Sequence, residues 1–311
     1  MTRRAVVLFN LGAPDRIESV EPFLFNLFRD VIALPAPLRW PAAKLAARLR
    51  ARTARGIYER LGGGSPLLAN TESQARALEA KLGTNHRVFV AMRYWRPFAD
   101  EAAAAIKAWG ADEIVLLPLY PQFSTTTTAS SLKDWRRAAA EAGLAAPTRA
   151  IESWPEQPGF IAAIAGEMRK LLALWRGREA KRILFSAHGL PERIVAKGDP
   201  YPGEVARTVA AIRAALAMPE LDWVLCYQSR VGPLKWLGPS IDDEIRRAGR
   251  DGVGVMVVPV AFVSEHSETL VELDADYKHL AGEVGVPTYL RAPTVGTSEA
   301  FIAGLAELVT A

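Results

Sequence analysis

The chain has 311 residues, of which 50% are hydrophobic, and its 38 basic and 34 acidic side chains give a net charge of +4. This length suits one large domain or two halves of about 150 residues each, and the composition excludes a disordered chain. A single cysteine, Cys226, excludes an internal disulfide and a metal site built from several thiolates. No apolar run approaches the roughly 18 residues of a spanning helix. Asn10 and Asp15 interrupt the first apolar stretch, which excludes a signal peptide, and we therefore expect a cytoplasmic protein.

Strands and helices are expected to alternate along the chain. Apolar runs between turn residues predict strands at residues 5–11, 87–92, 113–119, 181–186, 222–227 and 252–260. Helical patterns predict helices at residues 20–29, 37–55, 98–109 and 130–142. Thr71 and Gln74 have the spacing of a capping box, which predicts that a further helix opens at Thr71. This alternation is typical of an α/β fold.

The positive charge is concentrated in one segment. Seven of the 38 basic side chains lie between Arg39 and Arg60, with Glu59 as the one acid among them, and a largely apolar stretch at residues 20–34 precedes them. An apolar stretch beside a basic helix indicates an anionic partner, either a membrane surface or a ligand with carboxylates. The alternative is an amphipathic helix with a solvated basic face. No nucleic-acid partner is expected, because aromatic and basic residues do not interleave there.

Two pairs of segments resemble one another. Leu8–Pro14 resembles Leu184–Pro191, and Ile114–Tyr120 resembles Val255–Ala261. The repeat predicts two similar Rossmann-like halves, each a parallel sheet flanked by helices, which form one compact unit with a cleft between them. We place the halves at residues 1–150 and 151–311. Nucleotide chemistry is not favoured, because neither a dinucleotide-binding fingerprint nor a P-loop is present.

A histidine stands at the end of a predicted strand. The apolar run from Ile183 to Phe185 leads into Ser-Ala-His188-Gly, and Pro191 closes the turn. Ligands bind at the carboxyl ends of strands in open α/β sheets, and a histidine there can accept a proton or bind a metal near neutral pH. A core histidine bonded to a backbone carbonyl is the alternative, and this stretch alone favours neither.

A row of carboxylates follows the last long strand. Glu268, Glu272 and Asp276 are four residues apart, which places them on one stripe of a helix. Because like charges repel, such a stripe is expected to meet a cation, and oxygen ligands suit a hydrated divalent ion. For Asp276 we favour the alternative, a solvated face with Lys278 as counter-ion. For Glu268, two residues after His266, we favour function.

These residues together resemble the ferrochelatase family, whose members insert ferrous iron into a porphyrin. The resemblance covers nearly the whole chain and rests on the segments Asn10–Pro14, Tyr58–Pro66, Met92–Pro97, Leu119–Ser124, Ser186–Pro191, Tyr227–Pro233, Trp236–Pro239 and His266–Leu270. It implies that the chelatase fold brings two α/β halves together and that the substrates are a porphyrin and Fe²⁺.

The resemblance also implies roles for individual residues. His188 is implied as proton acceptor or metal ligand and Glu268 as its partner, while Glu272 and Asp276 continue a metal-binding row that leads outward. The positions that match porphyrin-binding residues are Leu11, Ser65, Arg93, Tyr94, Tyr120 and Trp236. Residues 20–60, called here the lip segment, match a lip of the active site that some members place on the membrane. We expect peripheral contact with the anionic inner face of the cell membrane. The residues expected to make it are Phe23, Phe25, Phe28, Arg48, Arg50 and Arg52.

Some family features are absent or different. Thr125 stands where certain members have a cysteine ligand of a [2Fe–2S] cluster, so neither this cluster nor another tightly bound cofactor is expected. Certain members that act on coproporphyrin have a tyrosine after the first strand, where this chain has Leu11. We therefore expect protoporphyrin IX as substrate, protohaem and two protons as products, and a monomer. The alternatives are a coproporphyrin III ferrochelatase, a sirohydrochlorin-type chelatase and a non-catalytic haem carrier.

Overall fold

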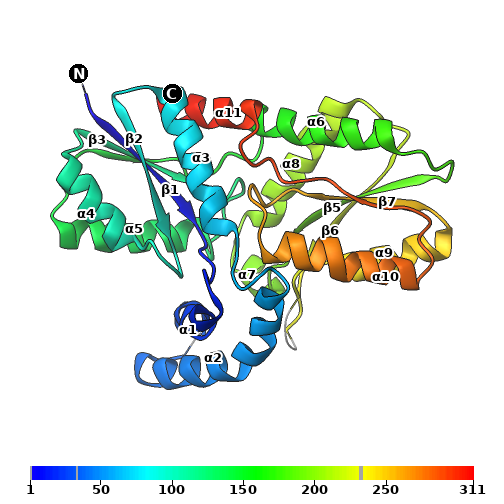
Figure 1. Ribbon diagram of the computed structural model, residues 1–311, viewed down its shortest axis with the longest axis horizontal. Helices are drawn as coiled ribbons and strands as arrows, with labels where there is room; N and C mark the ends of the chain where they lie inside the picture. The colour runs from blue at the N-terminus through cyan, green and yellow to red at the C-terminus, as the bar shows by residue number, and fades with distance from the viewer. Residues whose placement is uncertain (1, 33, 231–233) are drawn as a thin grey trace. The chain divides into compact units, whose positions relative to one another are not determined.

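The computed structural model describes the chain except for residues 1, 33 and 231–233, and for Ala36 it describes the backbone alone (Figure 1). The chain divides into two compact units. The first comprises residues 1–119, 125–152 and 309–311, and the second comprises residues 120–124 and 153–308.

The first unit is built on a parallel sheet of four strands in the order β2-β1-β3-β4. Its strands are β1 (Arg4–Asn10), β2 (His86–Met92), β3 (Glu113–Pro118) and β4 (Thr148–Ala150). Its helices are η1 (Ile17–Ser19), α1 (Val20–Val31), α2 (Ala36–Glu59), α3 (Leu67–Leu82), α4 (Ala99–Trp109) and α5 (Thr128–Ala142). Residues 5–9 of the central strand are almost fully buried, as the continuous apolar run predicts for a sheet covered on both faces.

The second unit repeats this plan, with a parallel sheet in the order β6-β5-β7-β8. Its strands are β5 (Lys181–His188), β6 (Asp222–Gln228), β7 (Gly254–Pro259) and β8 (Tyr289–Arg291). Its helices are α6 (Pro158–Leu174), α7 (Glu192–Val195), α8 (Tyr201–Leu216), α9 (Ile241–Asp251), the π-helix η2 (Glu268–Asp276), α10 (Tyr277–Glu283) and α11 (Glu299–Thr310), the last two residues of which belong to the first unit.

The two sheets have the same strand order, and the repeated segments occupy equivalent places in them. β1 is an inner strand of the first sheet and β5 is the equivalent inner strand of the second. The neighbouring inner strands are β3 and β7, respectively (Figure 1). The predicted α/β class with two similar Rossmann-like halves is therefore confirmed. The compact arrangement of the two halves and the cleft between them stay predictions.

Apart from a boundary that falls two residues later, after residue 152, the units differ from the predicted ranges 1–150 and 151–311 in two places. Residues 120–124 belong to the second unit, where the Gln122 amide donates to Thr208 Oγ1 at 2.8 Å and to the Val260 carbonyl at 3.0 Å. Residues 309–311 belong to the first unit, where Arg149 donates to the Val309 carbonyl at 2.7 Å. Both assignments depend on hydrogen bonds between residues that are far apart in the sequence, which no local sequence pattern predicts.

The predicted start of one helix is wrong. α3 begins at Leu67, so Thr71 is an interior residue and not a cap. The Thr71 hydroxyl is buried, donates to the Leu67 carbonyl at 2.7 Å and accepts from the Asn10 amide at 3.1 Å. A threonine that bonds the carbonyl four residues before it is compatible with a helix interior, which the capping-box spacing could not distinguish from a helix start.

The lip segment consists of α1 and α2, which pack against each other. Ala43, Ala47, Ala51 and Ala54 form a stripe of small residues along α2 and are each at most 7% exposed. Val20, Phe23 and Leu24 of α1 share a core cluster with three of these alanines. Phe23 is therefore buried, and the opposite face of α2 is left to solvent. In the part of the chain that the structure describes, no helix combines the length and the apolar character needed to cross a membrane.

Candidate active site

Two loops meet at the carboxyl edge of the first sheet. Leu11 directly follows β1, and Arg93 and Tyr94 directly follow β2. The Arg93 amide donates to the Asn10 carbonyl and the Tyr94 amide donates to the Leu11 carbonyl, each at 2.9 Å. Ligands bind at this edge in open α/β sheets. Three of the predicted substrate-binding residues therefore lie together where the fold favours a site.

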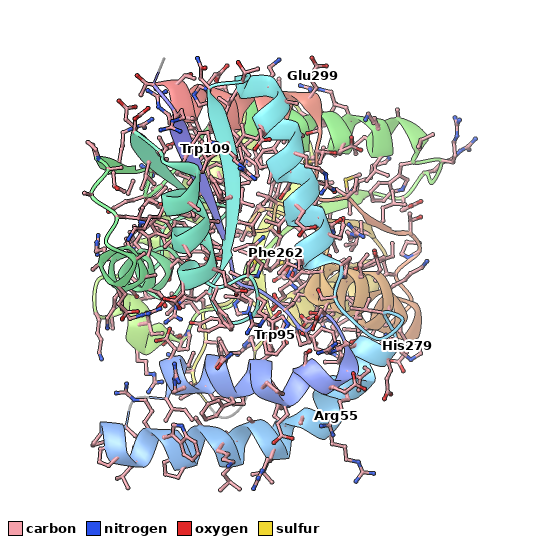
Figure 2. The ribbon with its side chains drawn as sticks, turned by 60° about the vertical axis from the view of Figure 1, so that its left-hand side comes forward. Arg55, Trp95, Trp109, Phe262, His279 and Glu299 are labelled. Atoms are coloured by element: carbon pink, nitrogen blue, oxygen red, sulfur yellow. The ribbon has the colours of Figure 1, made fainter. Side chains whose placement is uncertain are left out.

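A glycine brings Ser65 to the same edge. The Ser65 amide donates to the Pro14 carbonyl at 2.8 Å. A Cβ on Gly64 would lie 2.3 Å from the Asp15 carbonyl oxygen, so only glycine fits this approach. The Asp15 carboxylate accepts a hydrogen bond from the indole of Trp95 at 2.9 Å (Trp95 is labelled in Figure 2). The loops after β1 and β2 and the loop before α3 thus form one bonded group.

Asp30, in the last turn of α1, binds Arg93 and Tyr94 of this group and Ser130 of α5. Its Oδ2 accepts hydrogen bonds from Tyr94 OH and Ser130 Oγ, both at 2.7 Å, and lies 3.0 Å from an Arg93 nitrogen. Burial opposes ionisation, but the two hydroxyl donors and the Arg93 guanidinium outweigh it and lower the pKa of the Asp30 carboxyl. Tyr94 is 2% exposed. Its hydroxyl therefore serves this network and is not presented to solvent.

Replacing Asp30 with Asn is expected to lower the free energy of unfolding by about 1–2 kcal/mol near neutral pH, because Arg93 loses its carboxylate partner. The folded-state pKa lies below the ordinary value of 3.8. The stabilisation is therefore complete above that value and is lost as the pH falls toward the folded-state value. Denaturant unfolding should show a difference between the two proteins that shrinks below about pH 4.

A stability difference that stays constant as the pH falls from about 5 to below the folded-state pKa would contradict this assignment, because loss of the carboxylate charge must remove the pairing with Arg93. The control is Asp112→Asn. The side chain of Asp112 is 51% exposed, lies 3.9 Å from Arg3 Nε and accepts a hydrogen bond from the Arg3 backbone amide at 2.7 Å. An exposed pair of this kind contributes about 0–1 kcal/mol.

His188 is the last residue of β5, as predicted, and β5 lies between β6 and β7. Its Nδ1 lies 2.6 Å from the Gly189 carbonyl oxygen, which can only accept, so Nδ1 carries the proton of the neutral ring. Nε2 keeps its lone pair and lies 3.7 Å from Glu268 Oε1, and the side chain is 42% exposed. The carbonyl bond expected of a core histidine is present, but an exposed Nε2 beside a carboxylate favours a functional histidine.

Glu268 lies between two histidines. Its Oε2 is 3.7 Å from His266 Nε2, and within the described ranges this oxygen accepts no hydrogen bond. Burial favours the neutral acid, but the positive charges that His188 and His266 carry when protonated lower the pKa of the Glu268 carboxyl. The same pairing raises the pKa of His266 against the effect of its own burial. Glu268 is therefore a partly buried carboxylate with unused acceptor capacity.

Glu272 is the second carboxylate of this group. Its Oε2 accepts hydrogen bonds from Ser229 Oγ at 2.7 Å and from the Gln228 amide at 3.3 Å. Burial and then repulsion by Glu268 raise the pKa of the Glu272 carboxyl. Ser229 has a φ of 59°, which costs a non-glycine residue about 1–3 kcal/mol and is typical of functional sites. Two neighbouring carboxyl groups thus have pKa values shifted in opposite directions, a pattern typical of acid–base sites.

The acidic row lies on a π-helix, whose backbone bonds join residues five apart. Glu268 and Glu272 are partly buried in the group around His188, whereas Asp276 ends the helix and is exposed. The structure therefore brings together three of the four predicted metal-binding residues. Among residues 2–32, 34–230 and 234–311, no three His, Cys, Asp or Glu side chains form a group suited to hold a metal ion.

Trp236 and Tyr120 complete the predicted residues of the second unit. The backbone around Trp236 is bonded to the turn after His188, since the Leu237 amide donates to the Leu190 carbonyl at 3.0 Å. The Trp236 indole nitrogen is buried and finds no acceptor among the described residues. Tyr120 begins the segment that crosses into the second unit. Part of the predicted motif Tyr227–Pro233, namely residues 231–233, lies outside the described residues.

In each unit, several residues that support the predicted ones were not themselves predicted. Asp30 and Ser130 support Arg93 in the first unit, and Ser229 and Arg291 support the acidic row in the second. Ser229 lies in a segment that the sequence had already singled out. Asp30 and Arg291 carry no such signal, because their partners are distant in the sequence.

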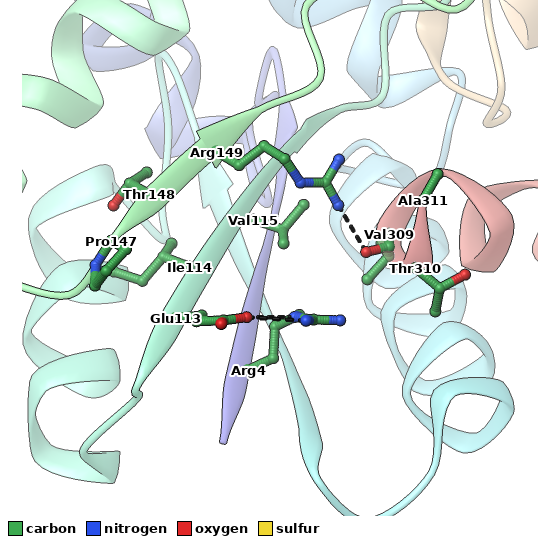
Figure 3. A pocket seen from close by; sticks show the side chains of 10 residues that line it. All are labelled: Arg4, Glu113, Ile114, Val115, Pro147, Thr148, Arg149, Val309, Thr310 and Ala311. Carbon is green, nitrogen blue, oxygen red and sulfur yellow. Dashed lines mark hydrogen bonds and ion pairs between the residues drawn. The ribbon is translucent and has the colours of Figure 1, made fainter. Parts of the chain in front are cut away.

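A hollow of about 310 Å³ in the first unit lies away from these residues (Figure 3). It is lined by the first residues of three strands, namely Arg4, Glu113 and Thr148. Arg4 and Glu113 pair at 2.9 Å. Because sites of α/β sheets form at the carboxyl ends of the strands, this hollow at the amino ends receives no role.

Comparisons with known proteins agree with the resemblance. Residues 3–311 match the family model described as Ferrochelatase. A ferrochelatase of Phenylobacterium zucineum (strain HLK1) is 55% identical and is matched over 97% of this chain and 89% of that protein. A ferrochelatase of Caulobacter vibrioides (strain NA1000 / CB15N) is 52% identical over 99% and 90% of the two chains, respectively.

Solved structures with the same fold include two chelatases. The sirohydrochlorin chelatase SirB from Bacillus subtilis subspecies spizizenii, in complex with cobalt, has a TM-score of 0.59 and 12% identity over 100% of this chain and 94% of that chain. CbiX, described as the terminal enzyme for biosynthesis of siroheme in denitrifying bacteria, has a TM-score of 0.51 and 18% identity over 99% and 98%. At these identities the likeness concerns the fold alone.

Proposed function

This chain belongs to the ferrochelatase family, a family of lyases that insert ferrous iron into porphyrins, and we propose that its own porphyrin is protoporphyrin IX. The products are then protohaem and two protons, and iron is a substrate and not a resident cofactor. The observation that carries the proposal is the contact of 3.7 Å between His188 Nε2 and the partly buried carboxylate of Glu268. This pair can accept a proton near neutral pH at the carboxyl edge of the sheet.

The charges of the second unit support an order of proton acceptance. A porphyrin must lose two pyrrole protons as the metal enters. His188 Nε2 takes the first proton, and the carboxylate of Glu268 stabilises the imidazolium that forms. Glu272, whose raised pKa brings it closer to neutrality than Glu268, takes the second and releases it to solvent. The two positive charges of Fe²⁺ replace those of the two protons, so the bound porphyrin stays neutral at its centre.

The side chains that match porphyrin-binding positions of the family are proposed to bind the ring. Leu11 contributes an apolar surface after β1, and Trp236 offers an indole donor with no acceptor in the described part of the chain. Ser65, Arg93 and Tyr120 are proposed to contact the porphyrin, while the buried Tyr94 acts by holding Asp30. Leu11 in place of a tyrosine supports protoporphyrin IX over coproporphyrin III.

Anaerobic incubation of the purified protein with ferrous iron and each porphyrin tests this proposal. The haem spectrum should appear faster, at equal concentrations, with protoporphyrin IX than with coproporphyrin III. A preference for coproporphyrin III would overturn the substrate assignment and leave the family unchanged. Turnover of sirohydrochlorin, or haem binding without any turnover, would overturn the proposed reaction.

Replacing Glu272 with Gln is expected to raise the KM for ferrous iron by about 10-fold or more, because the variant loses an oxygen ligand with negative charge. The KM for porphyrin should change little, because none of the proposed ring-contacting side chains is altered, whereas kcat should also fall, because Glu272 is the proposed acceptor of the second proton. Steady-state kinetics with each substrate varied in turn measures the two constants. Glu283→Gln in α10 is the control, because Glu283 is exposed and pairs with His279 at 3.3 Å. An unchanged iron dependence in Glu272→Gln would exclude Glu272 from the metal route. The same assay of Asp276→Asn decides whether Asp276 extends that route.

We further propose that the lip segment makes peripheral contact with an anionic membrane surface, through predicted arginines but through apolar residues other than those predicted. Phe23 is buried, and Phe25 and Phe28 pack against the core cluster of the lip segment. On the outer face of α2, Leu38, Leu45 and Leu49 are 57%, 60% and 73% exposed. The arginines at positions 50 and 52 are also exposed. Exposed leucines beside positive charge are typical of interfacial helices. This contact supports a location at the inner face of the cell membrane.

A further inference from the structure

The segment that carries the acidic row is held from both sides. On one side, the Gln228 amide donates to the Glu268 carbonyl at 3.2 Å, and both Gln228 and Ser229 donate to the Glu272 carboxylate. On the other side lies the edge strand β8. A π-helix is rare, and the same nine residues could form an α-helix. Its register therefore depends on contacts from outside the helix.

Arg291, the last residue of β8, contacts both ends of this segment. Its Nε donates to Asp274 Oδ1 at 2.8 Å, and its Nη2 donates to Asp274 Oδ2, which makes a bidentate pair with the π-helix. Its Nη1 donates to Glu265 Oε1 at 2.6 Å, in the loop before His266. The Arg291 side chain is 10% exposed. One buried guanidinium thus joins the residues that precede and follow Glu268.

Neighbouring groups on the same side strengthen this contact. The hydroxyl of Tyr289, also in β8, donates to the Leu273 carbonyl at 2.6 Å. The Thr294 amide donates to Glu265 Oε1 at 2.8 Å. The Leu273 carbonyl belongs to the π-helix itself, and its bond to Tyr289 satisfies an oxygen inside the helix from outside. β8 therefore restrains the helix by a side-chain pair and by a backbone oxygen.

We propose that Arg291 is a positioning residue that fixes the π-helical register of η2 and thereby the placement of Glu268 and Glu272 relative to His188. This proposal rests on the proposed function for its kinetic consequence. The partners of Arg291 are Asp274 and Glu265. None of the contacts described above joins Arg291 to His188 or to Glu268. If the guanidinium is lost, the segment can return to α-helical bonding, which changes the rotation of Glu272 about the helix axis relative to Glu268.

Arg182 provides a matched control. It is also a buried arginine between two carboxylates, with Asp222 at 2.6 Å, Asp251 at 2.8 Å and a side chain that is 9% exposed. It lies near the start of β5, at the opposite end of the strand from His188. Replacing either arginine leaves two carboxylates without their cation, so both variants should lose stability. Only the loss of Arg291 should reach the acidic row.

The experiment compares Arg291→Gln, Asp274→Asn and Arg182→Gln in the full-length chain. We expect Arg291→Gln and Asp274→Asn to lower kcat/KM for ferrous iron by about 10- to 100-fold, as loss of groups that orient a metal site does. The KM for porphyrin should change less than about 3-fold, and Arg182→Gln should keep both constants near the wild-type values. Asp274→Asn is the milder change and gives the answer if Arg291→Gln does not fold.

Hydrogen exchange of the backbone amides supplies a readout that needs no turnover. Exchange in residues 268–276 should be faster in Arg291→Gln and Asp274→Asn than in the wild type, while exchange in β5 stays the same. Equal exchange in residues 268–276 for Arg291→Gln and Arg182→Gln would overturn the proposal, as would an equal fall in iron kinetics for both. If the wild type makes no haem, the proposed function fails, but the exchange comparison still decides whether Arg291 holds the register.

Discussion

Replacing His188 with Ala is expected to lower kcat by at least about 10²-fold with ferrous iron and protoporphyrin IX, the low end for the loss of a positioned proton acceptor. His188 Nε2 carries a lone pair and lies beside Glu268 Oε1. The other oxygen of that carboxylate, Oε2, lies beside His266. The fold should survive, because the side chain is 42% exposed and its removal leaves no apolar cavity. Turnover is measured by the haem spectrum.

The matched control is His279→Ala. His279 lies in α10, is 78% exposed and pairs with Glu283 at 3.3 Å (Figure 2). Its loss should change neither kcat nor either KM. Near-normal turnover by His188→Ala would show that His188 is not the proton acceptor, whatever the control does.

Glu268→Gln extends the same prediction, again with a loss of at least about 10²-fold in kcat. Glutamine keeps the size of the side chain but cannot stabilise an imidazolium. The variant also has a readout outside catalysis. Glu268 raises the pKa of His266, so a histidine titration followed by NMR should show a lower pKa for His266 in the variant. Because groups that act as a unit are not additive, the double variant should be little worse than either single one.

Sequence reasoning located those parts of the fold and of the candidate site that follow from short local patterns of residues. The apolar run before His188 predicted a buried strand, and the resemblance between Leu8–Pro14 and Leu184–Pro191 predicted a second one. Both are central to their sheets, with β1 between β2 and β3 and β5 between β6 and β7. A strand buried on both faces has to be continuously apolar, which is why these elements could be located from composition alone.

The π-helix could not have been predicted in the same way. Glu268, Glu272 and Asp276 are four residues apart whether the backbone bonds join residues four or five apart, so their spacing does not select between the two helices. The selection is made by partners such as Tyr289 and Arg291, which come later in the chain and form part of a strand of three residues. A three-residue strand is too short to produce a pattern.

The prediction for the lip segment was right about its helices and wrong about Phe23, which is buried, while Phe25 and Phe28 are half-buried and the membrane contact stays a prediction. α1 and α2 are present at Val20–Val31 and Ala36–Glu59. The prediction assigned the apolar contact to the aromatic residues of α1. The small residues of α2 decide the packing, since an alanine every three or four residues lets two helices approach closely and turns the leucines of α2 to the other side. The stripe Ala43–Ala54 was visible in the sequence and would have located this face.

This corrected face gives the second large expected effect. Replacing Arg50 and Arg52 with Gln should weaken binding to anionic vesicles by about thirty-fold, because each basic residue near such a surface contributes about 1 kcal/mol and about 1.4 kcal/mol corresponds to a tenfold change. Both arginines lie on α2 and are exposed. Vesicle flotation at low and at high salt measures the effect, and salt should remove most of the difference between the two proteins.

Two controls separate charge from place and from apolar contact. Arg76→Gln with Lys81→Gln removes the same charge from α3 and should leave binding near the wild-type value. Leu45→Ser with Leu49→Ser keeps the charge and should weaken binding to neutral and anionic vesicles alike, because two leucines that are 60% and 73% exposed would no longer enter the interface. Equal flotation of the wild type with neutral and anionic lipid would remove the electrostatic part of the proposal. An unchanged response of the leucine variant would remove the apolar part, and α2 would then be a solvated basic helix.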